Sequence, residues 1–287
     1  MRLVSFGDPG AERPGVLIGS DILDLREARP AWPSSWRGIL MGNLWPELES
    51  MVAGAEQAVG LPTVPLGSVR LGAPVPDPSK IVAVGLNYRD HAEEQNKQPP
   101  EVPLLFSKAP SCLVGPNDPI VLPDDAVENQ VDAEAELCVV IATRGKNVRR
   151  EDAMSHILGY TAFNDVSGRG AQYGDKQWFR GKSFDTFGPC GPWIVTKDEL
   201  GDPSGLSLES HWGETRMQSG NTSNLIHDVP ALIAYISKQM TLEPGDLIAT
   251  GTPSGVGVFR DPKVFLQRGM TVRICLEKVG ELINLVV

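Results

Sequence analysis

The stretch Val131-Asp-Ala-Glu-Ala-Glu-Leu-Cys-Val-Val-Ile-Ala142 constrains this chain more than any other segment. We interpret it as a β-strand, in which successive side chains point to opposite faces. Glu134 and Glu136 then share one face and lie roughly 7 Å apart along the strand. The alternate residues form an apolar face, namely Ala135, Leu137, Val139 and Ile141. The segment therefore predicts a strand with one face packed on a core and two carboxylates on the other.

Two carboxylates this close together need a stabilising partner. Like charges repel each other, and burial would raise the pKa of one of the two carboxyl groups. A divalent cation removes this cost, and oxygen ligands favour Mg²⁺, Mn²⁺ or Ca²⁺ over Zn²⁺. The alternative is a solvated acidic face on an edge strand, because exposed glutamate is common.

A third carboxylate follows the next predicted strand. Tyr160 to Phe163 is expected to be a strand, and Asp165 lies just past its end. From there its carboxylate could reach the same ion as the two glutamates, whereas the alternative is an Asx turn at a strand end. Arg169 and Gln172 follow within a turn or two.

The segment Trp178-Phe-Arg-Gly-Lys-Ser-Phe184 places a lysine among aromatic side chains. Gly181-Lys182-Ser183 resembles the end of a phosphate-binding loop, but Lys176 stands where that loop requires a glycine. The phosphate-loop interpretation therefore fails. A lone lysine is normally solvated, and a lysine between aromatic residues suits a partly buried cation that faces a substrate anion.

The segment Asp90-His-Ala-Glu-Glu94 lies in a short helix that we expect to be exposed. Residues three apart share a helix face, so His91 meets Glu94 and not Glu93. A carboxylate beside an imidazole orients the ring and raises its basicity, as is needed to take a proton from water. A solvated helix is the alternative.

A glycine-rich stretch, Thr250 to Gly257, lies near the C-terminus. Its glycines would let backbone amides approach an anion closely, and Thr252 would add a hydroxyl group. A plain turn is the competing interpretation.

Composition excludes several classes of function. The 287 residues include 26 basic and 36 acidic side chains, and the formal charge of −10 repels nucleic acid and anionic membrane. No stretch approaches the ~20 apolar residues of a membrane-spanning helix, and the N-terminus lacks the pattern of a secretory signal. The four cysteines are scattered without a CxxC pair, so we expect reduced thiols in a cytoplasmic protein.

The wider pattern predicts two unequal parts. Residues 1–72 form a small N-terminal α+β accessory domain, and residues 73–287 form the metal-binding catalytic domain. In the first part, Ser35 caps a helix that Pro46 breaks or kinks, and the proline-rich stretch 61–80 is a plausible linker. Strands outnumber helices without alternating regularly, which indicates an α+β, mostly β fold and not a doubly wound sheet. The other expected elements are a helix at 150–158, a helix capped by Asp228, and strands at 246–250 and 271–276.

Taken together, these segments resemble the fumarylacetoacetate hydrolase family. The resemblance covers roughly residues 80–287 and rests on five motifs in the family's order. They are Val84-Gly-Leu-Asn-Tyr-Arg-Asp-His91, Glu134-Ala-Glu-Leu137, Asn164-Asp-Val-Ser167, Gly181-Lys-Ser-Phe-Asp-Thr-Phe187, and Glu243-Pro-Gly-Asp-Leu-Ile248 through Thr250-Gly-Thr-Pro-Ser-Gly-Val-Gly257. One departure is Gly170, which stands where the family often has an acid, and its absence could loosen the placement of Arg169.

The resemblance implies a mixed β-sandwich roll, usually dimeric, with one Mg²⁺ or Mn²⁺ per subunit. It implies roles for nine residues: metal ligation by Glu134, Glu136 and Asp165, catalysis by His91, Glu94 and Lys182, and substrate contacts by Arg169, Gln172 and Thr252. The implied partners are a small 2-oxo acid and a second copy of the chain.

The expected activity is cleavage of a C–C bond in an acylpyruvate-like 2,4-dioxo acid. The bond breaks to give a pyruvate enolate, which a chelated metal and Lys182 would stabilise. Oxaloacetate decarboxylation and 2-oxo acid hydration or isomerisation use the same site and remain alternatives. The non-enzymatic alternative is a Ca²⁺-binding protein.

Overall fold

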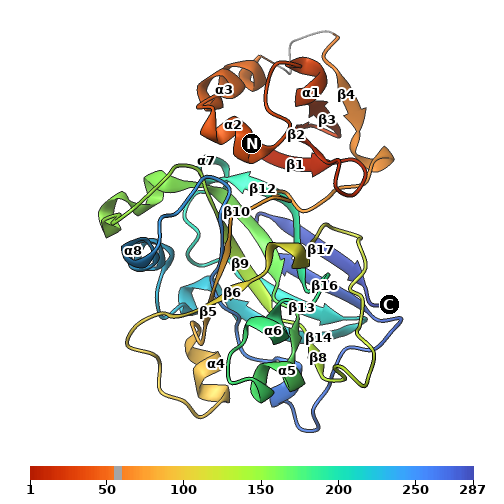
Figure 1. Ribbon diagram of the computed structural model, residues 1–287, viewed down its shortest axis with the longest axis vertical. Helices are drawn as coiled ribbons and strands as arrows, with labels where there is room; N and C mark the ends of the chain where they lie inside the picture. Colours follow the sequence, from red (N-terminus) through yellow and green to blue (C-terminus); the bar gives the residue numbers. More distant parts are fainter. Residues whose placement is uncertain (55–59) are drawn as a thin grey trace.

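The computed structural model describes residues 1–54 and 60–287. Its largest element is an 11-stranded mixed sheet, and a four-stranded antiparallel sheet lies beside it (Figure 1). In spatial order the large sheet contains β4 (Thr63–Pro65), β3 (Asp21–Asp24), β2 (Arg13–Ile18), β1 (Arg2–Phe6), β12 (Gly188–Thr196), β10 (Ile157–Asn164), β9 (Ala135–Ile141), β15 (Leu247–Ala249), β5 (Ile81–Gly85) and β6 (Leu104–Lys108), with β7 (Leu113–Val114) paired to β12. The smaller sheet contains β14 (Thr215–Asn221), β13 (Ser207–Trp212), β16 (Thr271–Leu276) and β17 (Gly280–Leu285), and β8 (Val131–Asp132) pairs with β11 (Ser167–Gly168).

The helices are short and lie around the sheets. The α-helices are α1 (Leu25–Ala28), α2 (Trp36–Met41), α3 (Trp45–Ala53), α4 (Arg89–Glu94), α5 (Arg169–Gly174), α6 (Phe179–Lys182), α7 (Lys197–Leu200) and α8 (Val229–Gln239). The 3₁₀ turns are η2 (Leu66–Ser68), η3 (Pro110–Cys112), η4 (Arg150–His156), η5 (Thr222–Asn224) and η6 (Gly257–Phe259). This architecture confirms the predicted α+β, mostly β sandwich.

The decisive segment forms the centre of the large sheet. Strand β9 lies between β10 and β15 and is buried along its whole length. The predicted apolar face packs in one core cluster with Leu208, Ile274 and Leu282 of the smaller sheet. Its opposite face contributes Cys138 and Val140 to a second cluster, which it shares with the N-terminal region. Because β9 is central, the alternative of a solvated edge strand is wrong.

The N-terminal region continues the large sheet. Strand β1 pairs antiparallel with β12, so strands β1–β4 extend the sheet that carries the site (Figure 1). The predicted linker at 61–80 contains strand β4 and turn η2, and Pro65 is tolerated because β4 is an edge strand. The division at residue 72 remains a prediction.

Most local signals match the structure. Ser35 caps α2 and Asp228 caps α8, each through its side-chain oxygen. Pro46 lies in the first turn of the separate helix α3, where its missing N–H costs nothing. Two expectations are wrong. The helix expected at 150–158 is the shorter turn η4, because strand β10 begins at Ile157. The helix near His91 is exposed only in part, since His91 and Ala92 are buried.

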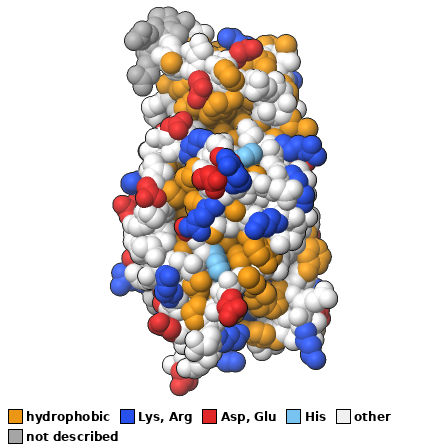
Figure 2. Space-filling model, turned by 90° about the vertical axis from the view of Figure 1, so that its left-hand side faces the viewer, with side chains coloured by type: hydrophobic (Ala, Val, Ile, Leu, Met, Phe, Trp, Pro, Cys, Tyr) orange, Lys and Arg blue, Asp and Glu red, His pale blue; other side chains and the backbone are white. Residues whose placement is uncertain are grey.

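Charged side chains of both signs are interspersed with apolar ones on the face that Figure 2 shows. No helix in the described part of the chain is long and apolar enough to cross a bilayer.

Candidate metal centre and active site

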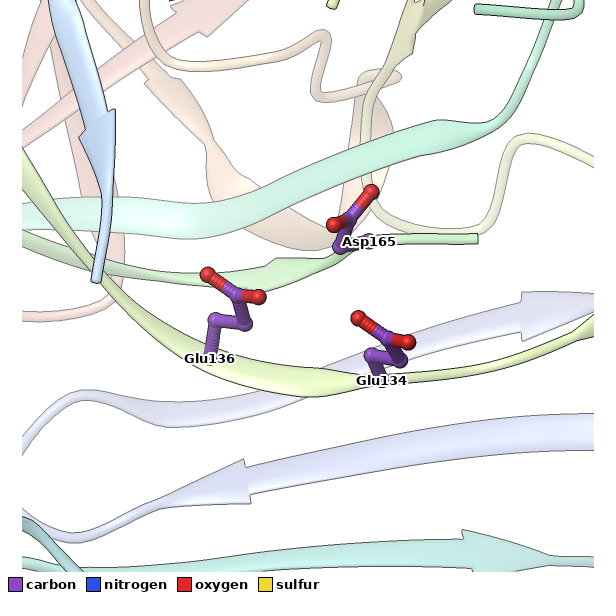
Figure 3. Close-up of side chains that lie close together, drawn as sticks. All are labelled: Glu134, Glu136 and Asp165. Carbon is purple, nitrogen blue, oxygen red and sulfur yellow. The ribbon is translucent and has the colours of Figure 1, made fainter. Parts of the chain in front are cut away.

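Three buried carboxylates converge where β9 and β10 run side by side. Glu136 lies in β9, Glu134 directly precedes it, and Asp165 directly follows β10. The antiparallel register pairs Ala135 with Asn164, and the backbone N–H of Asp165 donates to the carbonyl oxygen of Glu134 at 2.9 Å. One carboxylate oxygen from each acid lies within 4.8 Å of the other two, and the three side chains point toward one another (Figure 3). Their exposed fractions are 6%, 1% and 0% for Glu134, Glu136 and Asp165.

Three cations surround this cluster unevenly. The Lys182 ammonium lies 2.8 Å from Glu134 Oε2 and 2.6 Å from Asp165 Oδ2. Lys108 lies 2.7 Å from Asp165 Oδ1, and Arg169 lies 2.7 Å from Glu134 Oε1. Burial alone would raise the pKa of Glu134, but Lys182 and Arg169 outweigh burial and hold that pKa below its ordinary value. Glu134 therefore stays ionised.

Glu136 has a different environment. Burial and the neighbouring charges of Asp165 and Glu134 raise its pKa well above the ordinary value. Its carboxylate accepts a hydrogen bond from the Gly251 backbone at 2.8 Å. Within residues 1–54 and 60–287 it makes no ion pair. A cation bound among the three acids would supply the positive charge that Glu136 lacks, and oxygen-only donors suit a hard divalent ion. The residues present fit such an ion.

His91 lies in α4 and is only 6% exposed, so the solvated-helix interpretation is wrong. Its Nδ1 lies 3.0 Å from Glu94 Oε2, as the three-residue spacing predicted, and the other Glu94 oxygen accepts from the Gly255 backbone at 2.8 Å. The second ring nitrogen, Nε2, lies 2.9 Å from the side-chain amide nitrogen of Gln95.

These contacts fix which nitrogen of His91 carries the proton. Lys97 can only donate, and its Nζ lies 2.9 Å from Gln95 Oε1, so the oxygen of Gln95 faces Lys97. The NH₂ group of Gln95 therefore donates to His91 Nε2, which must carry a lone pair. The proton lies on Nδ1 and is donated to Glu94. In this tautomer the basic nitrogen is Nε2, which faces Gln95, a residue that lines the same pocket as His91.

The predicted substrate-binding residues lie close to the carboxylates. Arg169 donates from Nε and Nη2 to Asp132 Oδ2 at 3.0 and 2.7 Å, and from Nη1 to Gln172 Oε1 at 3.0 Å. Burial would lower the pKa of Arg169, but Asp132 and Glu134 raise it above the ordinary value. The expectation that Gly170 loosens Arg169 is therefore wrong.

The surroundings of Thr252 and Lys182 differ in part from the predicted ones. The Thr252 hydroxyl donates to the Ala135 carbonyl at 2.9 Å, so it offers a substrate only an oxygen lone pair. Lys182 is 1% exposed, and its ammonium lies 5.2 Å from the ring centroid of Phe106. The aromatic partner of this lysine therefore comes from β6 and not from its own segment.

One small pocket, with a volume of about 50 Å³, joins these groups. Seven of the nine predicted site residues line it: His91, Glu134, Glu136, Arg169, Gln172, Lys182 and Thr252. The other two, Glu94 and Asp165, contact the lining residues His91 and Lys182, at 3.0 and 2.6 Å. The pocket also has an aromatic wall, in which Trp178 packs edge-on against Phe106 at 5.1 Å between ring centroids.

A family model for the C-terminal region of fumarylacetoacetate (FAA) hydrolase matches residues 80–287. The chain belongs to the fumarylacetoacetate hydrolase family. It is 43% identical over 292 residues to the rat protein named oxaloacetate tautomerase Fahd2a, mitochondrial, with 100% of this chain and 92% of that protein covered. It is 41% identical over 285 residues to the 2,4-didehydro-3-deoxy-L-rhamnonate hydrolase of Sphingomonas sp. (strain SKA58), with 98% and 94% covered.

Solved structures of similar proteins agree with this assignment. Maleylpyruvate hydrolase from Sphingobium sp. SYK-6, in complex with manganese (II) ion and pyruvate, is 37% identical at a TM-score of 0.81, with 100% of this chain and 99% of that chain covered. A putative HpcE protein from Mycobacterium smegmatis is 35% identical at a TM-score of 0.88, with the same coverage. These similarities confirm the predicted fumarylacetoacetate hydrolase fold and identify the protein as an enzyme of this family.

One expectation does not survive the comparison. The predicted cytoplasmic location is contradicted, because the similar rat, bovine and human proteins are named mitochondrial. The prediction rested on free thiols and on the absence of a secretory signal. Both features are shared by any reducing compartment and could not select the cytoplasm.

Sequence reasoning missed three residues of this family site. Asp132 forms an ion pair with the Arg169 guanidinium. It lies two residues before Glu134, on the face that Glu134 and Glu136 share, so the two-residue spacing of the strand could have identified it. Lys108 donates to Asp165 and to the carbonyl oxygens of Val166 and Lys182, yet no motif surrounds it. Gln95 follows the predicted dyad directly, but its sequence position does not reveal that it contacts the imidazole.

Proposed function

We propose that this protein is a divalent-metal-dependent hydrolase that cleaves a C–C bond in 2,4-dioxo acids of the acylpyruvate class. Water and R–CO–CH₂–CO–COO⁻ give a carboxylic acid and pyruvate. The observation that carries the proposal is the His91–Glu94 pair, because His91 lines the same pocket as the buried carboxylates Glu134 and Glu136.

The substrate carboxylate and 2-oxo group would bind beside the acidic cluster. The cations Arg169 and Lys182 offer positive charge to the substrate anion, and Gln172 adds an amide beside Arg169. A divalent cation held by Glu134, Glu136 and Asp165 would act as a Lewis acid on the chelated oxygens. Mg²⁺ and Mn²⁺ both suit these ligands, and the manganese in the similar Sphingobium structure supports this choice.

His91 would move the proton that hydrolysis requires. The Gln95 amide donates to Nε2 and would first turn away; Nε2 would then take a proton from water as the water oxygen attacks the distal carbonyl carbon. Glu94 stabilises the imidazolium that forms, since its carboxylate lies 3.0 Å from Nδ1. The bond between the distal carbonyl carbon and C3 breaks, and its electron pair becomes the pyruvate enolate, beside which Lys182 donates hydrogen bonds. The imidazolium returns its proton to C3, which leaves His91 neutral again.

A second candidate is the tautomerisation of oxaloacetate. It is favoured by the names of similar proteins from rat and human, which are 43% identical over 100% of this chain. This reaction forms the same kind of enolate and needs a base at C3 but no attack by water. Oxaloacetate decarboxylation would also need no activated water.

We further propose a homodimer, as the family resemblance implies. Light scattering that gives the mass of a single chain at micromolar concentration would contradict it. The calcium-binding alternative has less support, because a structural Ca²⁺ site requires neither an imidazole–carboxylate pair nor a buried lysine.

The proposed function is tested with a panel of 2-oxo acids. Acetylpyruvate hydrolysis, oxaloacetate tautomerisation and oxaloacetate decarboxylation are measured with Mg²⁺, with Mn²⁺ and after EDTA treatment. We expect hydrolysis to depend on the metal, to disappear with EDTA and to return when metal is added back. Turnover of oxaloacetate without any acylpyruvate hydrolysis would replace the hydrolase proposal with the second candidate.

A further inference from the structure

Glu128 is a buried acid that the proposed mechanism does not use. It lies in the loop before β8, is 4% exposed, and forms no ion pair within the described residues. Its carboxylate accepts three backbone hydrogen bonds: from Gln130 at 2.9 Å, from Gly170 at 3.2 Å and from Ala171 at 2.7 Å. Both carboxylate oxygens are therefore occupied by backbone donors.

Two of these donors belong to the first turn of α5. A helix leaves its first N–H groups without partners inside the helix, and an acid is favourable there because of the helix dipole. The first residue of this helix is Arg169, and Gln172 lies one turn further along. The Glu128 carboxylate thus binds the backbone of the helical turn that carries the pocket residues Arg169 and Gln172.

The glycines on both sides of Arg169 point to the same arrangement. A Cβ atom at position 168 would lie 2.8 Å from Glu128 Oε2, and one at position 170 would lie 3.0 Å from both Glu128 oxygens. Neither Gly168 nor Gly170 has a positive φ, so the backbone itself does not require glycine at these positions. What both glycines provide is room for the carboxylate.

A further hydrogen bond links the first turn of α5 to the loop that contains Glu128. The backbone N–H of Arg169 donates to the Gln130 carbonyl oxygen at 2.9 Å, and Gln130 is itself held by Glu128. The Arg169 guanidinium then reaches Glu134, at 2.7 Å, in the acidic cluster. A shift of this turn would therefore move the cation away from the cluster.

We infer that Glu128 is a positioning residue, whose carboxylate fixes the turn that carries Arg169 and Gln172 and so sets their placement in the pocket. The inference rests on the proposed binding of a 2-oxo acid anion by these two residues. It concerns the backbone of α5, so part of it can be tested without substrate or metal.

The first test measures the turn directly. Hydrogen exchange of a peptide covering residues 168–174 is compared between the wild type and Glu128→Ala, both without added metal. We expect faster exchange in the variant, because the Gly170 and Ala171 amides lose their acceptor. Glu277→Ala is the matched control, since Glu277 accepts a backbone hydrogen bond from Ser207 on the surface at 2.9 Å. Unchanged exchange at 168–174 would overturn the inference.

The second test exchanges the position of the acid. Gly170→Asp in the wild type forces its side chain onto Glu128 and should weaken binding of oxalate, a mimic of the pyruvate enolate, to the Mg²⁺-loaded protein. In Glu128→Ala, which should itself bind oxalate about 10-fold more weakly (~1.4 kcal/mol), the same Gly170→Asp substitution should restore binding. Gly170→Asp would thus lower oxalate affinity in the wild type and raise it in Glu128→Ala. A general loss of stability would not produce these opposite effects.

The outcomes separate the two proposals. If the wild type does not bind oxalate, the proposed function fails, while the exchange result still tests Glu128. If the wild type binds oxalate and Glu128→Ala binds it equally well, the positioning role is wrong. Should Glu128→Ala not fold, Glu128→Gln replaces it, because an amide offers one acceptor oxygen and must lose at least the Ala171 bond or the Gly170 bond.

Discussion

Replacing Glu94 with glutamine should disable His91 without moving it. The Gly255 backbone donates to one Glu94 oxygen at 2.8 Å, and a glutamine would keep that bond by turning its amide oxygen toward Gly255. Its NH₂ group would then face His91 Nδ1, which would have to accept. The proton of the neutral imidazole would move to Nε2, where it also meets the NH₂ group of Gln95.

The size of the effect follows from this change of tautomer. A nitrogen that carries a proton cannot take one from water, so Glu94→Gln should lose most of the general-base contribution of His91. That contribution is about 10²–10⁴ in kcat, or roughly 3–5 kcal/mol of barrier. His91→Ala should fall in the same range for acylpyruvates, and both variants should still bind metal. Oxaloacetate decarboxylation, which needs no activated water, should fall less in both.

The measurement is kcat for acetylpyruvate hydrolysis at saturating Mg²⁺, together with metal affinity by calorimetry. The chain offers a matched control in His211, whose Nε2 lies 2.9 Å from Glu209 outside the pocket. Glu209→Gln and His211→Ala should leave kcat unchanged. A Glu94→Gln enzyme with wild-type kcat would refute the tautomer argument, and an unaffected His91→Ala enzyme would remove His91 from the mechanism.

Three further predictions concern other groups. Glu136→Gln keeps the size of the side chain but removes the charge of a metal ligand. Mg²⁺ affinity measured by calorimetry should therefore fall at least 10-fold, and Mg²⁺ should raise the melting temperature less than in the wild type. An unchanged affinity would exclude Glu136 as a ligand. Gln95→Ala frees the lone pair on His91, so diethyl pyrocarbonate should modify His91 faster, as followed by mass spectrometry of its peptide; equal rates would mean that Gln95 does not cover the ring. Burial raises the pKa of the Cys275 thiol to about 11, so little thiolate exists at pH 8. Labelling of Cys275 by iodoacetamide should therefore be slow at pH 8 and become faster as the pH rises toward 11. Rapid labelling at pH 8 would contradict this prediction.

Local patterns were sufficient for the core of the site. The alternation in 131–142 assigned the apolar face and the two glutamates correctly because a strand has a fixed period of two. The helical spacing of three placed His91 opposite Glu94 because both lie on one turn. In each of these cases a single element determines the relation between the residues.

Contacts between distant segments could not be obtained in this way. Lys108 reaches Asp165 across 57 positions, and Asp132 reaches Arg169 across 37. Burial of the helix around His91 was missed for a similar reason. The helix is polar in sequence, and one residue that packs on it, Phe259, comes from near the other end of the chain, with its ring centroid 5.9 Å from that of the imidazole.

The register between β9 and β10 links the fold to the chemistry. It pairs Phe163 with Glu136 and Asn164 with Ala135, so that the next residue, Asp165, meets Glu134. A slip of one residue would turn the apolar face of β9 toward the pocket and the glutamates toward the core. Packing energy therefore selects the same register that assembles the three carboxylates. The acids repel one another, and both the buried strands and the ion pairs with Lys182, Lys108 and Arg169 hold them together. A bound cation would add to the stability of this arrangement.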